Sequence, residues 1–474
     1  MKIKDFIKKN KLSICFILLF SCLTIFILSF AFRDADYFWH IKAGEYMVNH
    51  GLLNHDVFSW SVYGKYWMSH EWLFEIILYG FKCIFGNIHI LVYAFVCILS
   101  LFLIIFFSNK KEFLKNPLFG IVWCFLGIIL IYFVQGRPQL LSFILLCLSI
   151  WFCIDLYRNK DSKKIYFMPL LSIIWANVHG GSSNLGYLFC FIFLIVGLFH
   201  FDIGKVKSNR LSKKQLYKYL VIGIISILCI SINLHGFKMI IYPYENMANS
   251  LMISTISEWR ATSLSDINHY HYLVFIVVIL FIMLFSKKKI NFIDLVLFGI
   301  SIYLGLKSIR FWGYTYIIMS YVIFNYIEKR REDSGTKAIM LVISCLLVVV
   351  FITKVDSIYK KINHSYLNDK VISLIKSEKP KRLFNMYDFG GELVNNDIKV
   401  FIDGRADLYS KYNYKDYIDI STTDVNYIDI FNKYDFDYCL VSKKYPINDY
   451  LKYNDNYEIV YNEKSILLYK KRAN

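Results

Sequence analysis

The chain has 474 residues, of which 57% are hydrophobic and 19% are charged, with a mean hydropathy of +0.43 and a formal net charge of +18. Soluble domains have about 45–50% apolar and about 25% charged residues, so a soluble enzyme and a disordered chain are both excluded. The composition predicts a polytopic membrane protein with one soluble portion.

The positive charge is concentrated in the hydrophobic part of the chain. Residues 1–354 contain 35 Lys and Arg against 18 Asp and Glu, whereas residues 355–474 contain 19 against 18. A nucleic-acid-binding protein would have a basic patch on a folded domain, so no nucleic-acid partner is expected. The excess instead indicates membrane topology under the positive-inside rule.

Hydropathy predicts eleven membrane spans, since a span needs about 20 apolar residues. The first run, Leu12 to Phe32, is interpreted as an uncleaved span with a cytoplasmic N-terminus. The later spans are expected near 88–107, 117–134, 140–157, 165–178, 185–203, 219–235, 272–286, 293–309, 312–327 and 338–354. An odd number of spans places the C-terminal part of the chain outside the cytoplasm.

The distribution of basic residues supports this predicted membrane topology. The predicted cytoplasmic segments contain 25 Lys and Arg, including Lys287–Lys289 and Lys329–Arg331, against nine in the outward loops before residue 354. We therefore expect a multi-pass protein of the cell membrane. Its predicted domains are residues 1–354, a transmembrane domain, and residues 355–474, an extracytoplasmic α/β domain.

Two predicted outward loops are long, 33–87 and 236–271. In the first, apolar residues recur at helical spacing over Trp72–Phe85, which predicts an interfacial helix. The cysteines lie mostly in apolar runs and form no CxxC pair, which indicates packing rather than metal binding.

Short strands and helices alternate in the predicted C-terminal domain. The expected strands are Leu383–Tyr387, Lys399–Asp403, Tyr438–Ser442, Tyr457–Tyr461 and Ser465–Tyr469. The expected helices are Tyr366–Glu378, which would form a stalk, Gly391–Asn395 and Tyr427–Tyr434. No phosphate-binding glycine motif is present there.

The densest cluster of reactive side chains opens the first outward loop, in Arg33-Asp34-Ala35-Asp36-Tyr37-Phe38-Trp39-His40. Carboxylates beside a span are costly to place near lipid and are functional candidates. In an Asp-x-Asp sequence, one residue can act as a general base while the other orients it or holds a metal. The alternative is that Asp34 and Asp36 cap a helix, and both interpretations can be true.

Further candidates are predicted on the same side of the membrane. Three cations, Arg137, Lys307 and Arg310, depart from the positive-inside rule; they either snorkel to headgroups or form a pocket for a lipid-linked phosphate. Other polar candidates in the outward segments are Asp56, His70, Glu71, Trp72, Asn177, His179, Asn233, His235, Glu258 and Arg260.

These motifs together resemble the GT-C superfamily of integral-membrane glycosyltransferases, and a bacterial group within it. The matching sequences are Asp34-x-Asp36-x-x-Trp39-His40, Asp56-x-Phe58-Ser59, His70-Glu71-Trp72-Leu73, Arg137-Pro138-Gln139, Asn177-x-His179-Gly180, Asn385-x-Tyr387-x-x-Gly390-Gly391 and Phe401-Ile402-Asp403-Gly404-Arg405-x-Asp407-x-Tyr409. The loop after the third span has Arg137 and no carboxylate, which departs from familiar members.

The resemblance implies transfer of a sugar from a polyprenyl-phosphate-type donor to a cell-envelope acceptor at the outer leaflet, by inverting displacement. It implies Asp36, or else Asp34, as the base, and Arg137, His179, Lys307, Arg310 and Arg260 as donor-phosphate ligands. Trp39, His40, Asp56, His70, Glu71, Trp72, Asn177, Asn233, His235 and Glu258 are the expected substrate-binding residues.

No cofactor is certain, and a divalent metal is possible. The turn formed by Asp403, Arg405 and Asp407 is interpreted as a structural ion pair rather than a site. The rival functions are a non-catalytic transporter or binder of lipid-linked glycan, and an oligosaccharide polymerase or ligase.

Overall fold

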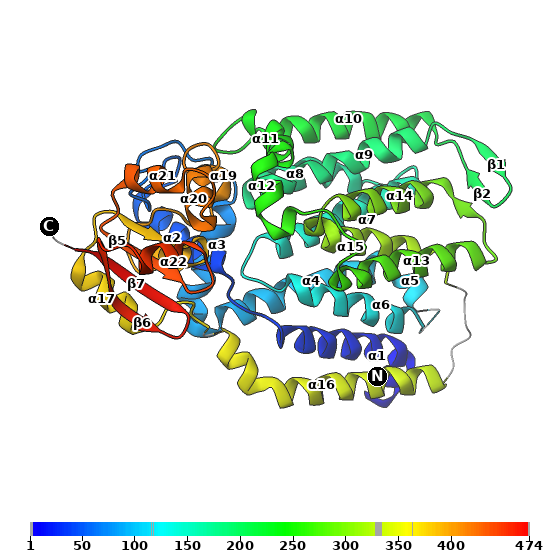
Figure 1. Cartoon of the computed structure of the whole chain (residues 1–474). Coiled ribbons are helices and arrows are strands. Elements are labelled where there is room, and N and C mark those ends of the chain that lie inside the picture. The colour runs from blue at the N-terminus through cyan, green and yellow to red at the C-terminus, as the bar shows by residue number, and fades with distance from the viewer. Residues whose placement is uncertain (1–2, 115, 117, 328–333, 363, 473–474) are drawn as a thin grey trace.

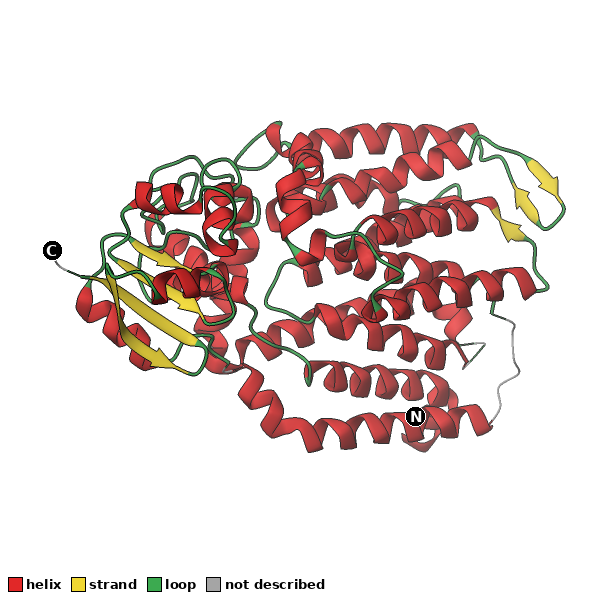
Figure 2. Ribbon diagram, in the orientation of Figure 1, coloured by secondary structure: helices red, strands yellow, loops and turns green. Residues whose placement is uncertain are grey.

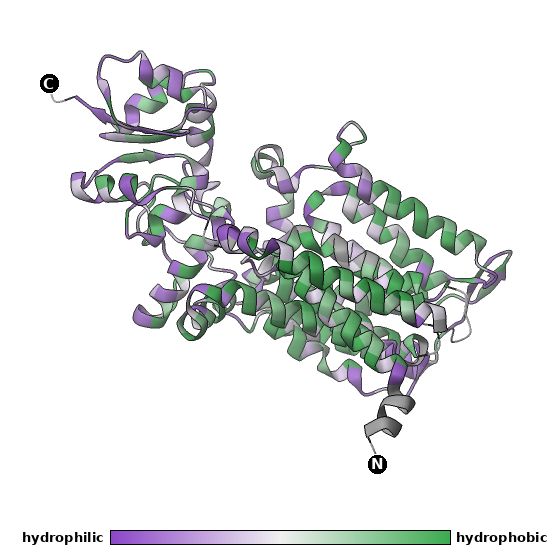
Figure 3. Ribbon diagram, turned by 90° about the horizontal axis from the view of Figure 1, so that it is seen from below, coloured by the Kyte–Doolittle hydropathy of each residue, from purple (hydrophilic) through white to green (hydrophobic). Residues whose placement is uncertain are grey.

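A computed structural model of the chain describes residues 3–114, 116, 118–327, 334–362 and 364–472. The basic stretch Lys329–Arg331 falls outside the described residues. Helices form an elongated bundle, and a smaller domain with a sheet covers one end of that bundle (Figures 1 and 2). Hydrophobic residues dominate the bundle, whereas hydrophilic residues gather at its two ends and over the smaller domain (Figure 3).

The helices and strands up to residue 362 are α1 (Ile3–Leu28), α2 (Ala35–His50), α3 (Trp72–Phe85), α4 (His89–Ser108), α5 (Lys110–Phe113), α6 (Leu118–Ile129), α7 (Gln139–Arg158), α8 (Met168–Val178), α9 (Asn184–Val196), β1 (Phe201–Ile203), β2 (Val206–Ser208), α10 (Lys213–Ile230), α11 (Lys238–Ala248), α12 (Ser250–Thr255), α13 (Tyr270–Phe285), β3 (Ile290–Asn291), α14 (Phe292–Lys307), α15 (Trp312–Ile323) and α16 (Ser334–Ile362).

Each of the eleven segments predicted to span the membrane contains a helix, namely α1, α4, α6, α7, α8, α9, α10, α13, α14, α15 and α16. Within the described residues, five helical stretches are long and apolar enough to cross a membrane: Lys11–Leu28, Trp72–Ser108, Gln139–Arg158, Ile267–Phe285 and Gly335–Lys361. The predicted segment 185–203 is too long, because α9 ends at Val196 and Phe201–Ile203 forms a strand.

Several predicted cytoplasmic loops contact one another at the end of the bundle away from the smaller domain. Strands β1, β2 and β3 form a small sheet there (Figure 1). Lys214 pairs with Asp161 at 2.8 Å, and Lys289 pairs with Asp202. The predicted cytoplasmic segments 158–164, 202–218 and 286–292 therefore lie together at this end, and its cytoplasmic assignment stays a prediction.

The C-terminal elements are α17 (Asp369–Glu378), β4 (Leu383–Asn385), α18 (Tyr387–Asn395), α19 (Ala406–Tyr409), α20 (Tyr414–Thr422), α21 (Tyr427–Tyr434), β5 (Tyr438–Ser442), α22 (Ile447–Lys452), β6 (Tyr457–Glu463) and β7 (Ile466–Lys471). The sheet order is β4-β5-β7-β6, with β4 parallel to β5 and the other pairs antiparallel.

Two sequence-based expectations for this region are wrong. Lys399–Asp403 is not a strand. The Asn385 side chain accepts a hydrogen bond from Phe401 N and donates one to Ile402 O, so it occupies backbone groups that a neighbouring strand would otherwise bond. The helix over Asp369–Glu378 is not a stalk, since it buries Val371 and Ile375 in the domain core. The connection to the bundle is made by α16, which continues to Ile362.

The first outward loop is part of the C-terminal domain in three dimensions. Trp60 donates from Nε1 to Leu383 O at 3.0 Å, and Ser61 donates to Phe401 O at 2.6 Å. One hydrophobic core contains Trp39, Phe58 and Trp67 together with the C-terminal strands. Residues 39–67 thus fold with the chain beyond residue 355, although sequence alone separates them.

A buried ion pair fastens this loop to the domain. Arg405 Nη1 lies 2.6 Å from Asp56 Oδ1, and its Nη2 lies 2.6 Å from Asp403 Oδ2, with all three side chains fully buried. Asp56 also accepts hydrogen bonds from Ser59 N and Ser59 Oγ. The predicted structural ion pair is confirmed for Asp403 and Arg405 and includes Asp56, whereas Asp407 is not part of it.

We expect Asp56→Asn to destabilise the protein by about 3–5 kcal/mol, because one partner of a buried ion pair is removed. Asp397→Asn is the matched control, since Asp397 pairs with Lys42 at 2.7 Å but is 74% exposed; exposed pairs contribute about 0–1 kcal/mol. Thermal unfolding of the purified variants in detergent measures both. Equal melting temperatures for the two variants would contradict the fastening role of Asp56.

Candidate active site

The first carboxylates lie at the start of α2. Asp34 is the N-cap residue, and its Oδ1 accepts a hydrogen bond from Tyr37 N at 2.9 Å. Asp36 occupies the first turn, where the helix dipole favours negative charge. Capping by Asp34 is therefore confirmed, and Asp36 is left with its carboxylate available for another partner.

That partner is Arg137, in the connection between α6 and α7. Its Nη2 lies 2.7 Å from Asp36 Oδ2, and its Nε pairs with Asp34 Oδ2. Nη1 lies 3.2 and 3.1 Å from the two carboxylate oxygens of Glu258. One guanidinium thus joins three carboxylates from segments that are distant in the sequence.

Burial and charge set the ionisation of these groups. Burial raises the pKa of Asp36 to about 7, against the lowering effect of Arg137, while Asp34 and Glu258 raise it further. Arg137 holds the pKa of Glu258 below its ordinary value. Burial alone would lower the pKa of Arg137, but the neighbouring carboxylates raise it well above its ordinary value, so it stays charged.

These groups line a cavity of about 250 Å³ between the bundle and the C-terminal domain. Its wall includes Asp36, Trp39, His40, His70, Glu71, Arg137, Gln139, His179, Ser182, Tyr242, Asn246, Glu258, Arg310, Tyr387, Asp388, Arg405 and Asp407. Gly404 closes the cavity from the domain side: a Cβ atom there would collide with Asp36 Oδ1. The backbone of the Asp403 turn can therefore approach Asp36 only because residue 404 has no side chain.

A second cavity of about 350 Å³ shares Arg137, Gln139, Glu258 and Arg310 with the first. Most of the surface of this second cavity is apolar, and the rest of its wall consists of Phe133, Gln135, Asn268, His269, His271, Ile309 and Trp312. The guanidinium of Arg310 lies over the Trp259 ring at 4.8 Å. Two cations thus stand at the boundary between a polar and an apolar cavity.

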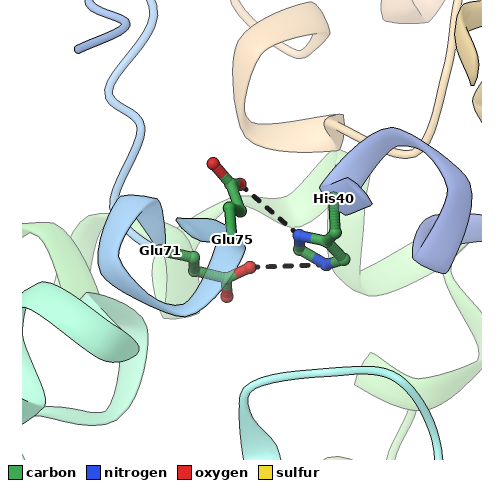
Figure 4. Close-up of side chains that lie close together, drawn as sticks. All are labelled: His40, Glu71 and Glu75. Atoms are coloured by element: carbon green, nitrogen blue, oxygen red, sulfur yellow. Dashed lines mark hydrogen bonds and ion pairs between the residues drawn. The ribbon is translucent and has the colours of Figure 1, made fainter. Parts of the chain in front are cut away.

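Histidines surround the Glu71 carboxylate on another part of the first cavity wall. His70 Nε2 lies 3.2 Å and His179 Nε2 lies 3.5 Å from Glu71 Oε1, and His40 Nε2 lies 3.6 Å from Glu71 Oε2. The other ring nitrogen of His40 lies 3.4 Å from Glu75 Oε1 (Figure 4).

Ionisation differs among the members of this cluster. Burial lowers the pKa of His40 and of His179 to about 3, so both imidazoles are neutral at pH 7. Burial alone would raise the pKa of Glu71, but the charge and hydrogen bond of His70 hold it below its ordinary value. Burial and the adjacent Glu71 raise the pKa of Glu75 well above its ordinary value.

The structure brings together much of the predicted site. The cavity wall contains Asp36, Trp39, His40, His70, Glu71, Arg137, His179, Glu258 and Arg310, and Asp34 contacts Arg137 behind it. The remaining predicted residues, Asp56, Trp72, Asn177, Asn233, His235, Arg260 and Lys307, are not in this wall.

Those seven side chains have other partners or face outward. Asp56 is held by Arg405, and Trp72 donates to Asn177 Oδ1 at 2.9 Å, with Asn177 in turn donating to Ile232 O. Asn233 donates to Gly236 O within its own turn, and His235 contacts Tyr66 OH.

The two remaining cations are exposed. Lys307 lies over the Tyr303 ring of its own helix, and Arg260 lies near Ser254 O. The structure therefore does not bring these seven residues into the cavity wall, and a role for them in the site stays a prediction.

Sequence reasoning missed the wall residues Asp407 and Tyr242, and Glu75, which lies behind the wall. Asp407 was assigned to the structural turn, yet its Oδ2 accepts from Tyr242 OH at 3.1 Å and lies 3.7 Å from His70 Nδ1. Tyr242 sits in α11, and Glu75 lies in the apolar face of α3. The signal for Glu75 was a carboxylate among buried apolar positions of an amphipathic helix.

The three carboxylates at Arg137 do not fit a divalent metal ion. Metal ligands must direct free oxygen atoms at one position, and here the guanidinium nitrogens are paired with the oxygens of Asp34, Asp36 and Glu258. The charge that a metal would supply at these carboxylates is supplied by Arg137.

We expect Arg137→Gln to destabilise the protein by about 3 kcal/mol at pH 8, because the buried Asp34 and the partly buried Asp36 lose their counter-charge, whereas Glu258 is 37% exposed and contributes less. Without the cation the folded-state pKa of Asp36 rises, so the stability deficit grows as the pH increases from 5.5 to 8.5. Arg260→Gln is the matched control on an exposed arginine. Thermal unfolding at both pH values checks this, and a pH-independent deficit or an equal effect of Arg260→Gln would contradict it.

No family model and no curated protein matches this sequence. Among solved structures, it is similar to the apo oligosaccharyltransferase of Archaeoglobus fulgidus, with 11% identity, 90% of this chain and 69% of that chain covered, and a TM-score of 0.48. It is also similar to the archaeal oligosaccharyltransferase AglB of the same organism in complex with an inhibitory peptide and a dolichol-phosphate: 10% identity, 92% and 70% coverage, and a TM-score of 0.50. At 10% identity this second likeness is one of fold alone.

Proposed function

We propose that the protein is a membrane glycosyltransferase that moves a sugar from a polyprenyl-phosphate-type donor to a cell-envelope acceptor at the outer leaflet. The observation that carries the proposal is the pairing of Asp36 with Arg137 in a polar cavity that shares its cations with an apolar one. A lipid-linked sugar has the same order of parts: a polar sugar, an anionic phosphate and an apolar chain.

The donor phosphate would bind at the boundary of the two cavities. Among the described residues, no carboxylate lies within ion-pair distance of Arg310, whereas Arg137 is engaged by three. Arg310 is therefore the cation most available to an incoming phosphate, and Arg137 retains N–H groups for a second contact. Similarity to a fold solved with a dolichol-phosphate supports this choice of ligand.

The reaction would be a single inverting displacement. Asp36 removes the proton from an acceptor hydroxyl as its oxygen forms a bond to the anomeric carbon of the sugar. The bond between that carbon and the phosphate oxygen breaks, and its electron pair leaves with the lipid phosphate. Arg137 and Arg310 stabilise the negative charge that develops on this oxygen.

Burial gives Asp36 an ionisation suited to this role. A base works best when its pKa lies near the working pH, and burial raises the pKa of Asp36 to about 7. Trp39 lies beside it, with Nε1 donating to Asp36 Oδ1 at 3.3 Å. The Trp39 ring, in the cavity wall, could also stack on the sugar.

Two rivals predict different features. A transporter would place its binding groups near the middle of the bilayer, where both sides have access in turn; here they lie where the bundle meets the C-terminal domain. That position favours the enzyme. A polymerase or ligase of lipid-linked oligosaccharides would use the same chemistry, and only its reaction product would distinguish it from the proposed enzyme.

We expect Asp36→Asn to lower transfer by about 10²–10⁴-fold, because an amide cannot accept the acceptor proton. Asp34→Asn should lose less transfer activity than Asp36→Asn, since Asn also caps helices. In the wild type, kcat/KM should rise with pH through about 7 as Asp36 deprotonates. Release of polyprenyl phosphate from synthetic polyprenyl-phosphate hexoses measures the activity of both variants and the pH dependence of the wild type.

Full activity of Asp36→Asn would remove Asp36 from the mechanism. A large loss in Asp34→Asn with little loss in Asp36→Asn would transfer the role of base to Asp34. Thermal unfolding of each variant separates loss of catalysis from loss of folding.

We expect Arg310→Gln to weaken the binding of dolichyl phosphate by about 10-fold or more, the effect of losing about 1.5–3 kcal/mol from a charged hydrogen bond. Lys307→Gln is the matched control, because it removes the same charge three residues away on an exposed side chain. Calorimetric titration in detergent measures both affinities. Equal weakening by the two substitutions would show a diffuse charge effect instead of a site.

A further inference from the structure

The histidines around Glu71 come from three separate parts of the fold. His40 lies in α2, His70 precedes α3 together with Glu71, and His179 follows the end of α8. Each directs its Nε2 atom toward the same carboxylate, at 3.2–3.6 Å. Nothing in the displacement at Asp36 requires this arrangement.

The other nitrogen of each ring has a partner that fixes the ring orientation. His40 Nδ1 lies 3.4 Å from Glu75 Oε1, and His70 Nδ1 lies 2.8 Å from Tyr242 OH. His179 Nδ1 lies 2.7 Å from Ser142 Oγ and 2.9 Å from Ser182 Oγ. Metal-bound histidines are held in this way, by a hydrogen bond to the nitrogen that does not face the metal.

One nitrogen in the cluster lacks a hydrogen bond. Within the described residues, His179 Nε2 has no hydrogen-bond partner, although the residue is only 1% exposed. Its contact with Glu71 at 3.5 Å, like that of His40 at 3.6 Å, is longer than an ordinary hydrogen bond. Buried polar atoms without a partner are rare, so this one points to a group that completes the site.

Separations of this size suit ligands of a common ion. With metal–ligand distances of about 2.0–2.2 Å, two ligands of a tetrahedral zinc ion are about 3.4 Å apart. One ligating atom from each of His40, Glu71 and Glu75 lies within 4.8 Å of those of the other two. His70 and His179 are outside this group, and their imidazoles, now 3.2 and 3.5 Å from Glu71 Oε1, would turn to join the ion.

We propose that the cavity wall holds one divalent transition-metal ion, bound by His40, His70, His179 and Glu71, with Glu75 orienting His40. Imidazole nitrogens with one carboxylate are the donor set of zinc, which we take as the first choice of metal. The site is separate from the carboxylates at Arg137, and metal binding does not depend on the proposed glycosyl transfer.

The test is direct measurement of metal in the purified, tag-free, full-length protein in detergent. After chelator treatment and equilibration with zinc, elemental analysis should find one tightly bound ion per chain. Cobalt substituted for zinc should give visible absorption bands of nitrogen and oxygen coordination. No bound zinc, or binding no tighter than to exposed histidines, would overturn the proposal.

Variants assign the ligands. Glu71→Gln and His179→Ala should lose the bound ion and the cobalt spectrum, whereas His55→Ala should keep both, since His55 is exposed in the same outward loop. Tyr242→Phe removes the hydroxyl that contacts His70 and Asp407 but no proposed ligand, and it should weaken zinc affinity by about 10–100-fold. This milder variant keeps the test decisive if a ligand variant fails to fold.

Retention of wild-type zinc affinity by Glu71→Gln, His179→Ala and Tyr242→Phe would place the ion elsewhere and overturn the proposal. Because no donor lipid is present in these measurements, their failure would leave the role of Asp36 intact. An inactive protein that still binds zinc would instead contradict only the proposed transfer.

Discussion

The ion pairs of the partly buried Arg137 guanidinium are the interaction on which the arrangement of the site depends. Arg137 joins Asp34 and Asp36 at the start of α2 to Glu258 in the second long outward loop, and it comes from a third connection of the bundle. Three carboxylates this close in a largely buried region would repel one another strongly without it. The cation therefore both assembles the cavity and sets the ionisation of the acid proposed to carry the chemistry.

The C-terminal domain is a structural part of the same site. Its Asp403 turn is anchored to the first outward loop through Arg405 and Asp56, and Gly404 lies directly against Asp36. Asp407, from the same turn, reaches the histidine cluster through Tyr242. The bundle and the C-terminal domain thus form one cavity together. The predicted domain boundary at residue 354 therefore divides residues that line the same cavity.

Much of the helical architecture could be predicted, because long apolar runs and alternating basic loops are strong signals. Asp36, Arg137 and Arg310 are predictable because charged residues beside predicted spans are exceptional, whereas Glu258 is predictable only as a polar residue of a long outward loop. The direction of a side chain is a different matter: Lys307 and Arg310 are three residues apart and face different surroundings.

The residues that sequence reasoning missed depend on tertiary contacts. Nothing local shows that Asn385 would replace the strand bonding of Phe401, or that Asp407 would face a cavity built mainly by the bundle. The histidine cluster was recognised only as scattered polar residues, since its members come from positions 40, 70 and 179. Their convergence on Glu71 is visible only in the folded chain.

The central claim is that a lipid phosphate binds between Arg137 and Arg310, with Asp36 on the polar side. The most direct measurement is an electron cryomicroscopy structure of the full chain with bound dolichyl phosphate. The account predicts density for the phosphate in contact with both guanidinium groups and for the lipid chain in the cavity lined by Phe133 and Trp312. A phosphate bound elsewhere, with these two cavities occupied only by solvent or detergent, would contradict it.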